Sequence, residues 1–306
     1  MNNNESEKDI VNYLGFNNVD ELAELLSRST LSTLQAGTNF IYSSAHYFEI
    51  NNISKNYVSD IDHEENYLGF STIHNDKFDL NSIENTRLPE SRSHVGWWCV
   101  LNYNEKNNKS YKRTSAYRGI AEKCNPLDCG HILGLSLFKY IELKQKLKEQ
   151  ESRPSSSNKT KDDSNQKLQD ICNNVKYNVF PQFPRANRNR KNDVGQLRFE
   201  ELVRDHLTHN RDDKVYYEVE KVYFDPKHDE IPIGTRIFAS VVDKCSELNL
   251  KGKLTLPFHV FIPNYAVTDS EGQSGDTDYN LDYLLENEDF KIRELYGKFY
   301  GHKWRE

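Results

Sequence analysis

Hydrophobic residues recur at helical spacing near the beginning of the chain. Between Asn18 and Gln35, leucines and a valine fall mostly three or four residues apart, and acidic residues follow directly after Asn18. This spacing predicts an amphipathic helix that is capped by Asn18. The stretch that follows, to about Pro89, is rich in Asn, Ser and Asp and predicts no long element. Its short apolar patches fit both a packing extension of the main domain and a separate interaction module, for example for an inhibitor or regulatory protein.

Alternating apolar and polar positions predict strands in the centre and the second half of the chain. The alternation places Trp97 on an apolar face and leaves Trp98 on the other face, where we expect it to be exposed. The order of the elements predicts an α+β fold with an antiparallel sheet. The expected elements are a strand at His94–Tyr103, a helix at Arg198–Leu207, and strands at Val215–Phe224, Gly234–Asp243 and Leu254–Asn264.

A polar segment interrupts this pattern between Lys139 and Asp170. Lysines and glutamates surround Pro154 and three serines, so the segment contains too few apolar residues to form a core. We therefore predict a solvated insertion at about 145–170. Separately, we expect the last part of the chain to be helical. The predicted organisation is an accessory region at 1–90 that is partly helical, a main domain at 91–265 and a C-terminal helical tail at 266–306.

Composition narrows the class of protein. No run approaches the ~18 consecutive apolar residues that a membrane helix requires, so no membrane partner is expected. Met1–Asp20 does not have a basic start followed by an apolar stretch, so we expect a cytoplasmic protein or one exported without a cleaved signal peptide. The five cysteines are an odd number and are scattered, which favours reduced thiols over a disulfide framework.

Positive charge is concentrated in one part of an acidic chain. The net charge is -7, yet the window from Arg185 to Arg204 holds six basic and three acidic residues and is therefore +3. A local basic patch of this kind suits a polyanion such as nucleic acid. The asparagines and glutamates beside it offer hard oxygen ligands, which Mg²⁺ prefers, whereas arginines suit phosphate oxygens.

A short motif supplies a candidate general base. In Asp128-Cys129-Gly130-His131 the histidine ends a polar turn and precedes a buried-looking run that begins at Ile132. An imidazole at the border between solvent and core can be neutral near pH 7 and can be oriented by its neighbours, as a general base requires.

Four segments in order resemble the DNA/RNA non-specific endonuclease family, whose catalytic core is a ββα-metal finger. They are Asp128-Cys129-Gly130-His131, Asn178-Val179-Phe180-Pro181-Gln182, Asn187 and Arg198-Phe199-Glu200, against the family pattern D-R-G-H, N-[LI]-x-P-Q, an Asn and a Glu on the following helix. The resemblance covers about Ser91 to Tyr265. It implies a metal-dependent, sequence-nonspecific endonuclease that hydrolyses phosphodiester bonds of DNA and/or RNA, with Mg²⁺ or Mn²⁺ as cofactor. Such an enzyme suits a toxin or a defence effector.

The resemblance also assigns roles to individual residues. His131 matches the general base, Asn187 the direct metal ligand, and Glu200 the carboxylate that orients metal-bound water. Two arginines, Arg185 and Arg188, are candidates to neutralise charge on the phosphorus. Substrate contacts are expected from Arg190, Lys191, Arg113 and Arg118.

Several alternatives stay open at this level. Cys129 stands where the family has an arginine, which fits a slower enzyme, a transfer of that cation's role to another arginine, or a degenerate nuclease fold kept for binding. Glu201 is a rival to Glu200. A zinc site made of Cys124, Cys129, His131 and Cys172 would instead give a zinc-stabilised nucleic-acid-binding module. The choice between DNA and RNA also remains open.

Overall fold

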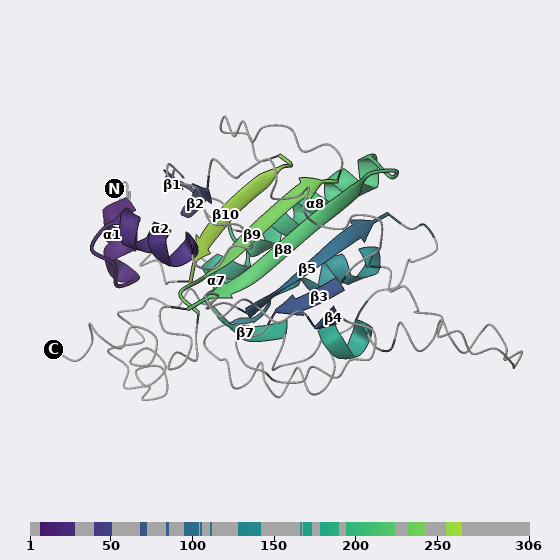
Figure 1. Ribbon diagram of the computed structural model, residues 1–306, viewed down its shortest axis with the longest axis horizontal. Helices are drawn as coiled ribbons and strands as arrows, with labels where there is room; N and C mark the ends of the chain where they lie inside the picture. The colour runs from purple at the N-terminus through teal and green to yellow at the C-terminus, as the bar shows by residue number, and fades with distance from the viewer. Residues whose placement is uncertain are drawn as a thin grey trace, which may run out of the picture.

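The computed structural model of the chain is a twisted sheet with helices on one face and at one end (Figure 1). It describes residues 7–27, 40–50, 68–71, 84–85, 95–103, 105, 111, 128–141, 166, 168–172, 178–189, 194–223, 232–242 and 255–264. The elements are α1 (Glu7–Tyr13), α2 (Val19–Ser27), β1 (Phe40–Ser43), β2 (Tyr47–Ile50), β3 (Leu68–Ser71), β4 (Glu84–Asn85), β5 (Val95–Asn102), β6 (Asp128–His131), the 3₁₀ helix η1 (Leu135–Tyr140), β7 (Val179–Gln182), α7 (Pro184–Asn187), α8 (Gln196–His209), β8 (Lys214–Val222), β9 (Gly234–Val241) and β10 (Phe258–Pro263).

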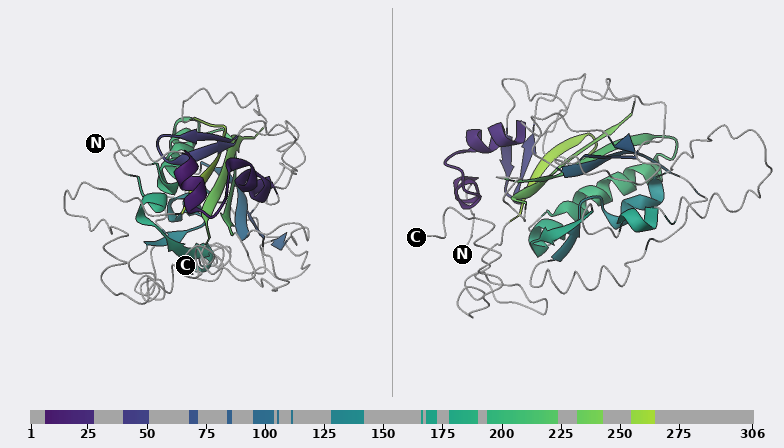
Figure 2. Two further views of the ribbon diagram at one scale, coloured as in Figure 1. Left: turned by 90° about the vertical axis from the view of Figure 1, so that its left-hand side faces the viewer. Right: turned by 60° about the horizontal axis from the view of Figure 1, so that its bottom comes forward.

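The strands form one large and one small sheet. The large sheet has the order β1-β2-β10-β9-β8-β5-β3-β4 and is antiparallel except for the pair β3 and β4. The small sheet is the antiparallel pair β6 and β7. Helix α8 follows this pair in the chain and lies against one face of the large sheet (Figure 2). The predicted α+β class, the antiparallel sheet and a ββα unit are thus confirmed, as are the predicted strands at β5, β8, β9 and β10.

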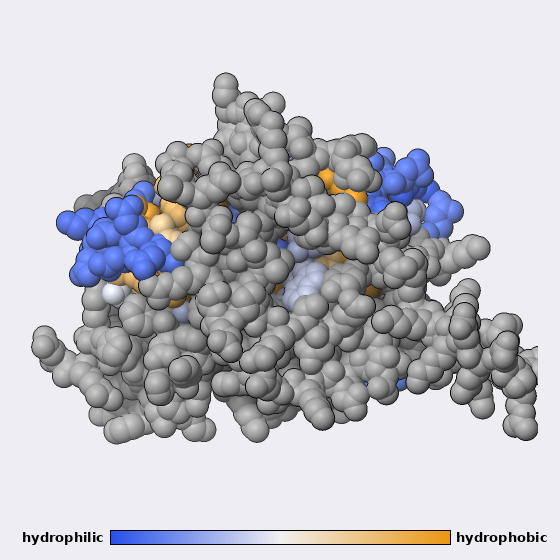
Figure 3. Space-filling view, viewed as in Figure 1, coloured by the Kyte–Doolittle hydropathy of each residue, from blue (hydrophilic) through white to orange (hydrophobic). Residues whose placement is uncertain are grey.

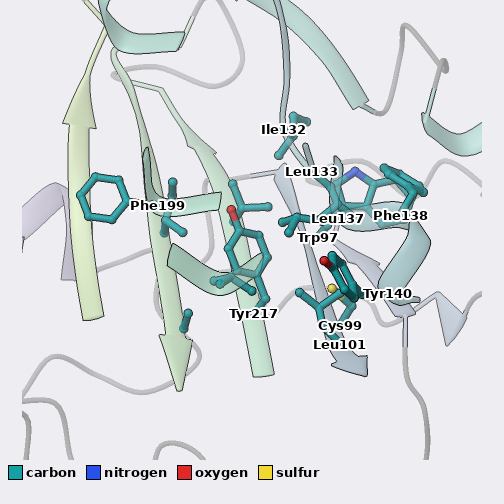
Figure 4. Packing of buried hydrophobic residues seen from close by; sticks show 14 of the residues in the cluster. Trp97, Cys99, Leu101, Ile132, Leu133, Leu137, Phe138, Tyr140, Phe199 and Tyr217 are labelled. Atoms are coloured by element: carbon teal, nitrogen blue, oxygen red, sulfur yellow. The ribbon is translucent and has the colours of Figure 1, made fainter. Parts of the chain in front are cut away.

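The main core lies between α8 and the large sheet. Alternate residues of the central strands face the helix, as the pleat of a strand requires, and Phe199, Val203 and Leu207 of α8 are fully buried against them. Figure 4 shows Phe199 and Tyr217 on one side of this core, with Trp97 and Leu101 beside the residues of η1 on the other. The sequence pattern predicted this face correctly.

The opposite face of the sheet is also buried, which makes the prediction for Trp98 wrong. Its side chain packs with Val100, Tyr216, Phe238 and Val242 in a second apolar cluster. A period of two residues distinguishes the two faces of a strand, but it does not determine whether both faces are covered.

A buried ionic group joins three strands on this second face. Arg236 on β9 pairs with Glu218 and Glu220 of β8, and its Nη1 donates to Nε2 of His259 on β10 at 2.9 Å. Burial, and then the charge of Arg236, hold the pKa of His259 well below its usual range. The imidazole is therefore neutral and carries its proton on Nδ1. Removing Arg236 would leave two buried carboxylates without the positive charge that balances them, a change that costs about 3–5 kcal/mol.

The N-terminal region extends the same sheet. Strand β2 pairs with β10, and α1 and α2 pack with Phe48, Ile50 and Phe261 in a further apolar cluster. In Figure 3 the outer surface of these helices is hydrophilic. The backbone amide of Glu21 donates to Oδ1 of Asn18 at 3.0 Å, so the predicted cap is confirmed, whereas the described helix ends at Ser27. These contacts are those of a packing extension.

The prediction of a solvated insertion at 145–170 is wrong at its C-terminal end. Residues 166 and 168–172 are helical, and Leu168, Ile171 and Cys172 are buried in the main core. Residues 142–165 and the predicted C-terminal tail at 266–306 lie outside the described residues. Within the described part of the chain, no helix has the length and apolar character needed to cross a membrane.

The packing of Leu168 leads to a first prediction. Leu168→Ala should lower the free energy of unfolding by about 2–5 kcal/mol, because it removes a buried side chain and leaves a cavity. The exposed neighbour Gln166 provides the control, since Gln166→Ala should change stability by less than about 0.5 kcal/mol. Urea denaturation of both variants is the measurement, and equal stabilities would show that the segment does not pack.

Candidate active site

A pocket of about 440 Å³ opens where the small sheet, η1, α7 and α8 meet. Four of the residues that were assigned to catalysis or metal binding line it together, namely His131, Asn187, Arg188 and Glu200. The full lining is Tyr111, Cys129, His131, Gly134, Leu135, Ser136, Lys139, Asn187, Arg188, Leu197 and Glu200. Residues that are far apart in the chain are therefore brought to one place by the ββα unit.

The small sheet fixes the position of His131. Strand β6 ends at His131, which pairs with Val179 of β7 in the register Asp128↔Gln182 to His131↔Val179. The side chain of His131 is only 8% exposed but borders the pocket. Its backbone carbonyl accepts a hydrogen bond from Nε2 of Gln196 at 2.7 Å, which ties the end of β6 to the first turn of α8.

Asn178 has a structural position. Its Oδ1 accepts from the backbone amide of Leu133 at 2.8 Å, and its Nδ2 donates to the carbonyls of Leu133 and Cys172 at 3.1 and 3.2 Å. The side chain is fully buried and does not line the pocket. Asn178 therefore secures the chain that leaves β6 and is not a metal ligand in this arrangement.

Asn187 is oriented by Asp128, the first residue of the D-x-G-H motif. Its Nδ2 donates to Oδ2 of Asp128 at 2.8 Å. Because the nitrogen side of the amide is engaged in this way, Oδ1 is the atom that Asn187 can offer to a cation in the pocket. The same carboxylate accepts two hydrogen bonds from Arg188, at 2.7 Å from Nε and 2.5 Å from Nη2.

Helix α7, which carries Asn187, is short and is held by side chains from other elements. The backbone amide of Phe183, at its start, donates to Oδ1 of Asn264 at 2.8 Å. Nε2 of Gln182 donates to the carbonyl of Ala186 at 3.3 Å. Four residues of helix have few hydrogen bonds of their own, so these contacts define where the helix lies.

Glu200 is a buried carboxyl in the wall of the pocket, and both of its oxygens accept hydrogen bonds. Its Oε1 accepts from Gln196 at 2.9 Å and its Oε2 from Ser136 at 3.5 Å. Burial raises the pKa of Glu200 from 4.5 to about 7, while the hydrogen bond from Gln196 and the charge of Arg204 act in the opposite direction. Gly134 packs directly on this carboxylate, and a Cβ at that position would overlap it. The chain therefore has a glycine here to leave room for the acid.

Of the two adjacent candidate carboxylates, Glu200 lines the pocket and Glu201 does not. Glu201 accepts a hydrogen bond from Nδ2 of Asn189 at 2.9 Å and lies 3.9 Å from Arg198, away from the residues that line the pocket. Consecutive residues of a helix point about 100° apart, so only one of the two can face the pocket. Glu200 is that residue.

Sequence reasoning missed the role of Gln196. Its Nε2 lies within hydrogen-bonding distance of the carbonyls of His131 and Ile132 and of Glu200, and its Oε1 accepts from Gln182 at 3.3 Å. The one available signal was its position four residues before Glu200 on a helix, which places both on one face.

The remaining predicted residues fall into two groups. Arg188 lies at the pocket with 55% of its side chain exposed, whereas Arg185 is buried and its Nη2 donates to the carbonyl of His46 at 2.9 Å. Arg185 is therefore not among the residues that line the pocket. The expected substrate contacts Arg113, Arg118, Arg190 and Lys191 lie outside the described residues.

The cysteines of the alternative zinc site do not gather among the described residues. Cys172 is in the core, where its thiol donates to the carbonyl of Gln169 at 3.2 Å, while Cys129 lines the pocket. The described part of the chain contains no group of three or more His, Cys, Asp and Glu side chains arranged to hold a metal. Cys124 lies outside it.

Comparison with solved structures finds similar chains at low identity. NucA from Streptococcus agalactiae with no metal bound is 21% identical, with 81% of this chain and 90% of that chain covered and a TM-score of 0.43. NucA with a magnesium ion bound is 18% identical, with 82% and 91% covered and a TM-score of 0.41. Sda1 nuclease with a bound zinc ion is 14% identical, with 60% and 72% covered and a TM-score of 0.30. No family model and no curated protein matches the sequence.

The raised pKa of Glu200 predicts a pH dependence of stability in the metal-free protein. Between pH 4.5 and about 7 the folded chain keeps a proton on Glu200 that the unfolded chain has released. The free energy of unfolding should therefore fall as the pH rises through this range, by about 3 kcal/mol from this one group. Glu200→Gln should remove that contribution.

Urea denaturation in the presence of a metal chelator, at about pH 5 and at about pH 8, measures this change in the free energy of unfolding. Glu201→Gln is the matched control, because it changes the adjacent, partly exposed carboxylate, whose charge is the smallest cause of the shift, and should retain most of the pH dependence of the wild type. An identical pH dependence in the wild type and in Glu200→Gln would show that burial does not perturb this carboxyl.

Proposed function

We propose that the chain is a metal-dependent, sequence-nonspecific endonuclease that hydrolyses phosphodiester bonds of nucleic acid. The observation that carries this proposal is that His131, Asn187 and Glu200 line one pocket and that each forms a hydrogen bond with a residue of another element. These are an imidazole, a neutral oxygen ligand and a carboxylate, and the guanidinium of Arg188 lines the same pocket. Together they can provide the general base and the metal ligands of metal-assisted phosphodiester hydrolysis.

The residues present fit a small divalent cation. Oδ1 of Asn187 and the carboxylate of Glu200 are hard oxygen donors, and Mg²⁺ uses few protein ligands because it keeps several waters. Gly134 leaves the space that the Glu200 carboxylate occupies. Mg²⁺ or Mn²⁺ held there would supply positive charge to the phosphate and to the leaving oxygen.

His131 is the proposed general base. A neutral imidazole at the edge of the pocket would take a proton from a water that attacks the phosphorus in line with the leaving group. The new bond joins the water oxygen to phosphorus, and the bond from phosphorus to the 3′ oxygen breaks. The proton of the water passes to His131, the leaving 3′ oxygen takes a proton from solvent, and the product carries a 5′ phosphate. The bond from Gln196 to the backbone of His131 keeps the residue at the end of β6 during this step.

Arg188 supplies positive charge near the phosphate in the absence of the motif arginine. Cys129 and Arg188 line the same pocket, which supports a transfer to Arg188 of the role that the family gives to the residue at 129. The bidentate contact with Asp128 fixes the plane of the guanidinium, and its exposed side can bind phosphate oxygens. Lys139 lies on another wall and offers a second cation for a neighbouring phosphate.

The sharpest test of this function is His131→Ala. Cleavage of plasmid DNA and of structured RNA should fall by at least ~10²-fold, because general-base catalysis is lost. The fold, the affinity for Mn²⁺ and the binding of DNA should stay close to those of the wild type, because other residues provide them. A fully active His131→Ala protein would contradict the assignment, and a loss of bound metal together with stability would point to a zinc ligand instead.

Arg188→Ala tests the second element of the site. Cleavage should slow by about 10-fold or more, and the slope of log affinity against log salt should decrease by about one ion, equally for any DNA sequence. Arg198→Ala is the matched control, since Arg198 lies on α8 outside the pocket lining. An unchanged slope and rate in Arg188→Ala would place the phosphate contact on another cation.

A further inference from the structure

The turn between β1 and β2 contacts the segment that carries the proposed metal ligand. Arg185 precedes Asn187 by two residues on α7, and its buried guanidinium donates from Nη2 to the carbonyl of His46 at 2.9 Å. The backbone amide of Val194, just before α8, donates to the carbonyl of Ala45 at 3.1 Å. Two consecutive carbonyls of one N-terminal turn therefore hold both ends of the connection from α7 to α8.

The conformation of the turn makes this contact possible. His46 has a φ of +65°, in the left-handed region, and its amide donates to the carbonyl of Ser43 at 2.8 Å. The amide of Ala45 donates to Oγ of Ser43 at 3.2 Å. A residue with a β-branched side chain would disfavour this φ, whereas asparagine tolerates it.

Close contacts connect the turn with α8, and α7 with the start of α8. The ring of Tyr47, directly after the turn, meets the ring of Phe199 on α8 edge-on, with centroids 5.3 Å apart. Gly195, at the start of α8, packs so closely on the carbonyls of Arg185 and Arg188 that a Cβ would overlap them. Loss of the contact from Arg185 would therefore let α7 shift relative to α8, and with it Asn187 relative to Glu200.

We propose that the β1–β2 turn is part of the active-site scaffold and that Arg185 is a positioning residue which sets the affinity of the site for its metal. This inference rests on the proposed role of Asn187 as metal ligand. It gives the N-terminal region a function in the reaction that its sequence did not reveal. It also replaces the expected contact of Arg185 with phosphate by a contact with the protein backbone.

Arg185→Met tests the proposal, because methionine keeps an unbranched chain in the buried space and removes the donor. The Mg²⁺ concentration for half-maximal cleavage should rise by about 10-fold, as is typical when a residue that supports a metal ligand is lost. The rate at saturating Mg²⁺ should stay near that of the wild type. Arg185→Lys should lie between the two, because an ammonium can still donate to the carbonyl of His46.

Direct titration of Mn²⁺ without nucleic acid, followed by electron paramagnetic resonance, measures the same affinity independently of cleavage. The matched pair is His46→Val and His46→Asn, which change the same side chain. His46→Val should weaken Mn²⁺ binding like Arg185→Met, whereas His46→Asn should bind as the wild type does. This pair carries the test if Arg185→Met does not fold.

The outcomes separate this inference from the proposed function. Folded Arg185→Met and His46→Val proteins that bind Mn²⁺ as tightly as the wild type would overturn the inference and leave the nuclease intact. A wild-type protein that binds Mn²⁺ more tightly than both variants but cleaves neither DNA nor RNA would support the inference and overturn the proposed activity. A wild-type protein that binds no Mn²⁺ would overturn both.

Discussion

The buried amide of Gln196 is the contact on which the candidate site depends. It is 1% exposed and joins the backbone at the end of β6, the side chain of Gln182 on β7 and the carboxylate of Glu200 on α8. A buried amide that loses a partner costs about 1–3 kcal/mol for each unsatisfied group. The two strands and the helix therefore have one favourable arrangement, and in it His131 and Glu200 line the same pocket.

The other polar residues of the site are oriented by the protein before any ligand binds. One carboxylate, Asp128, accepts hydrogen bonds from both Asn187 and Arg188. Orientation of this kind avoids a reorganisation cost when charge develops in a reaction. Burial raises the pKa of Glu200, and a cation bound next to this carboxyl would favour its charged form.

The N-terminal region belongs to the same folded unit as the site. Strands β1 and β2 extend the large sheet beyond β10, and the turn between them contacts the connection from α7 to α8. Only 36% of the chain is hydrophobic. Buried polar side chains such as Arg236, Asn178 and Asn264 therefore help to define how the strands and helices pack. The hydrogen bonds of each side chain can all form in only one arrangement of its neighbours.

The sequence by itself determined the local features of this protein. Alternation of apolar residues located β5 and β10, and the cap at Asn18 located the start of α2. The resemblance that four motifs carry, in their order along the chain, placed His131, Asn187 and Glu200 in one hypothesis. These features depend on residues that are neighbours in the chain or on motifs that can be read in order, so no contact had to be known.

Only the tertiary structure decided which side chains face the pocket and which serve the scaffold. Trp98 is buried because the second face of the sheet is covered, and Leu168 is buried because its short helix packs on the main core. Arg185 binds the carbonyl of His46, a residue from a distant part of the chain, and Gln196 binds the backbone of β6. Periodicity and charge give the direction and the type of a side chain, but its partner depends on which segments fold against it, and that is a long-range property of the whole chain.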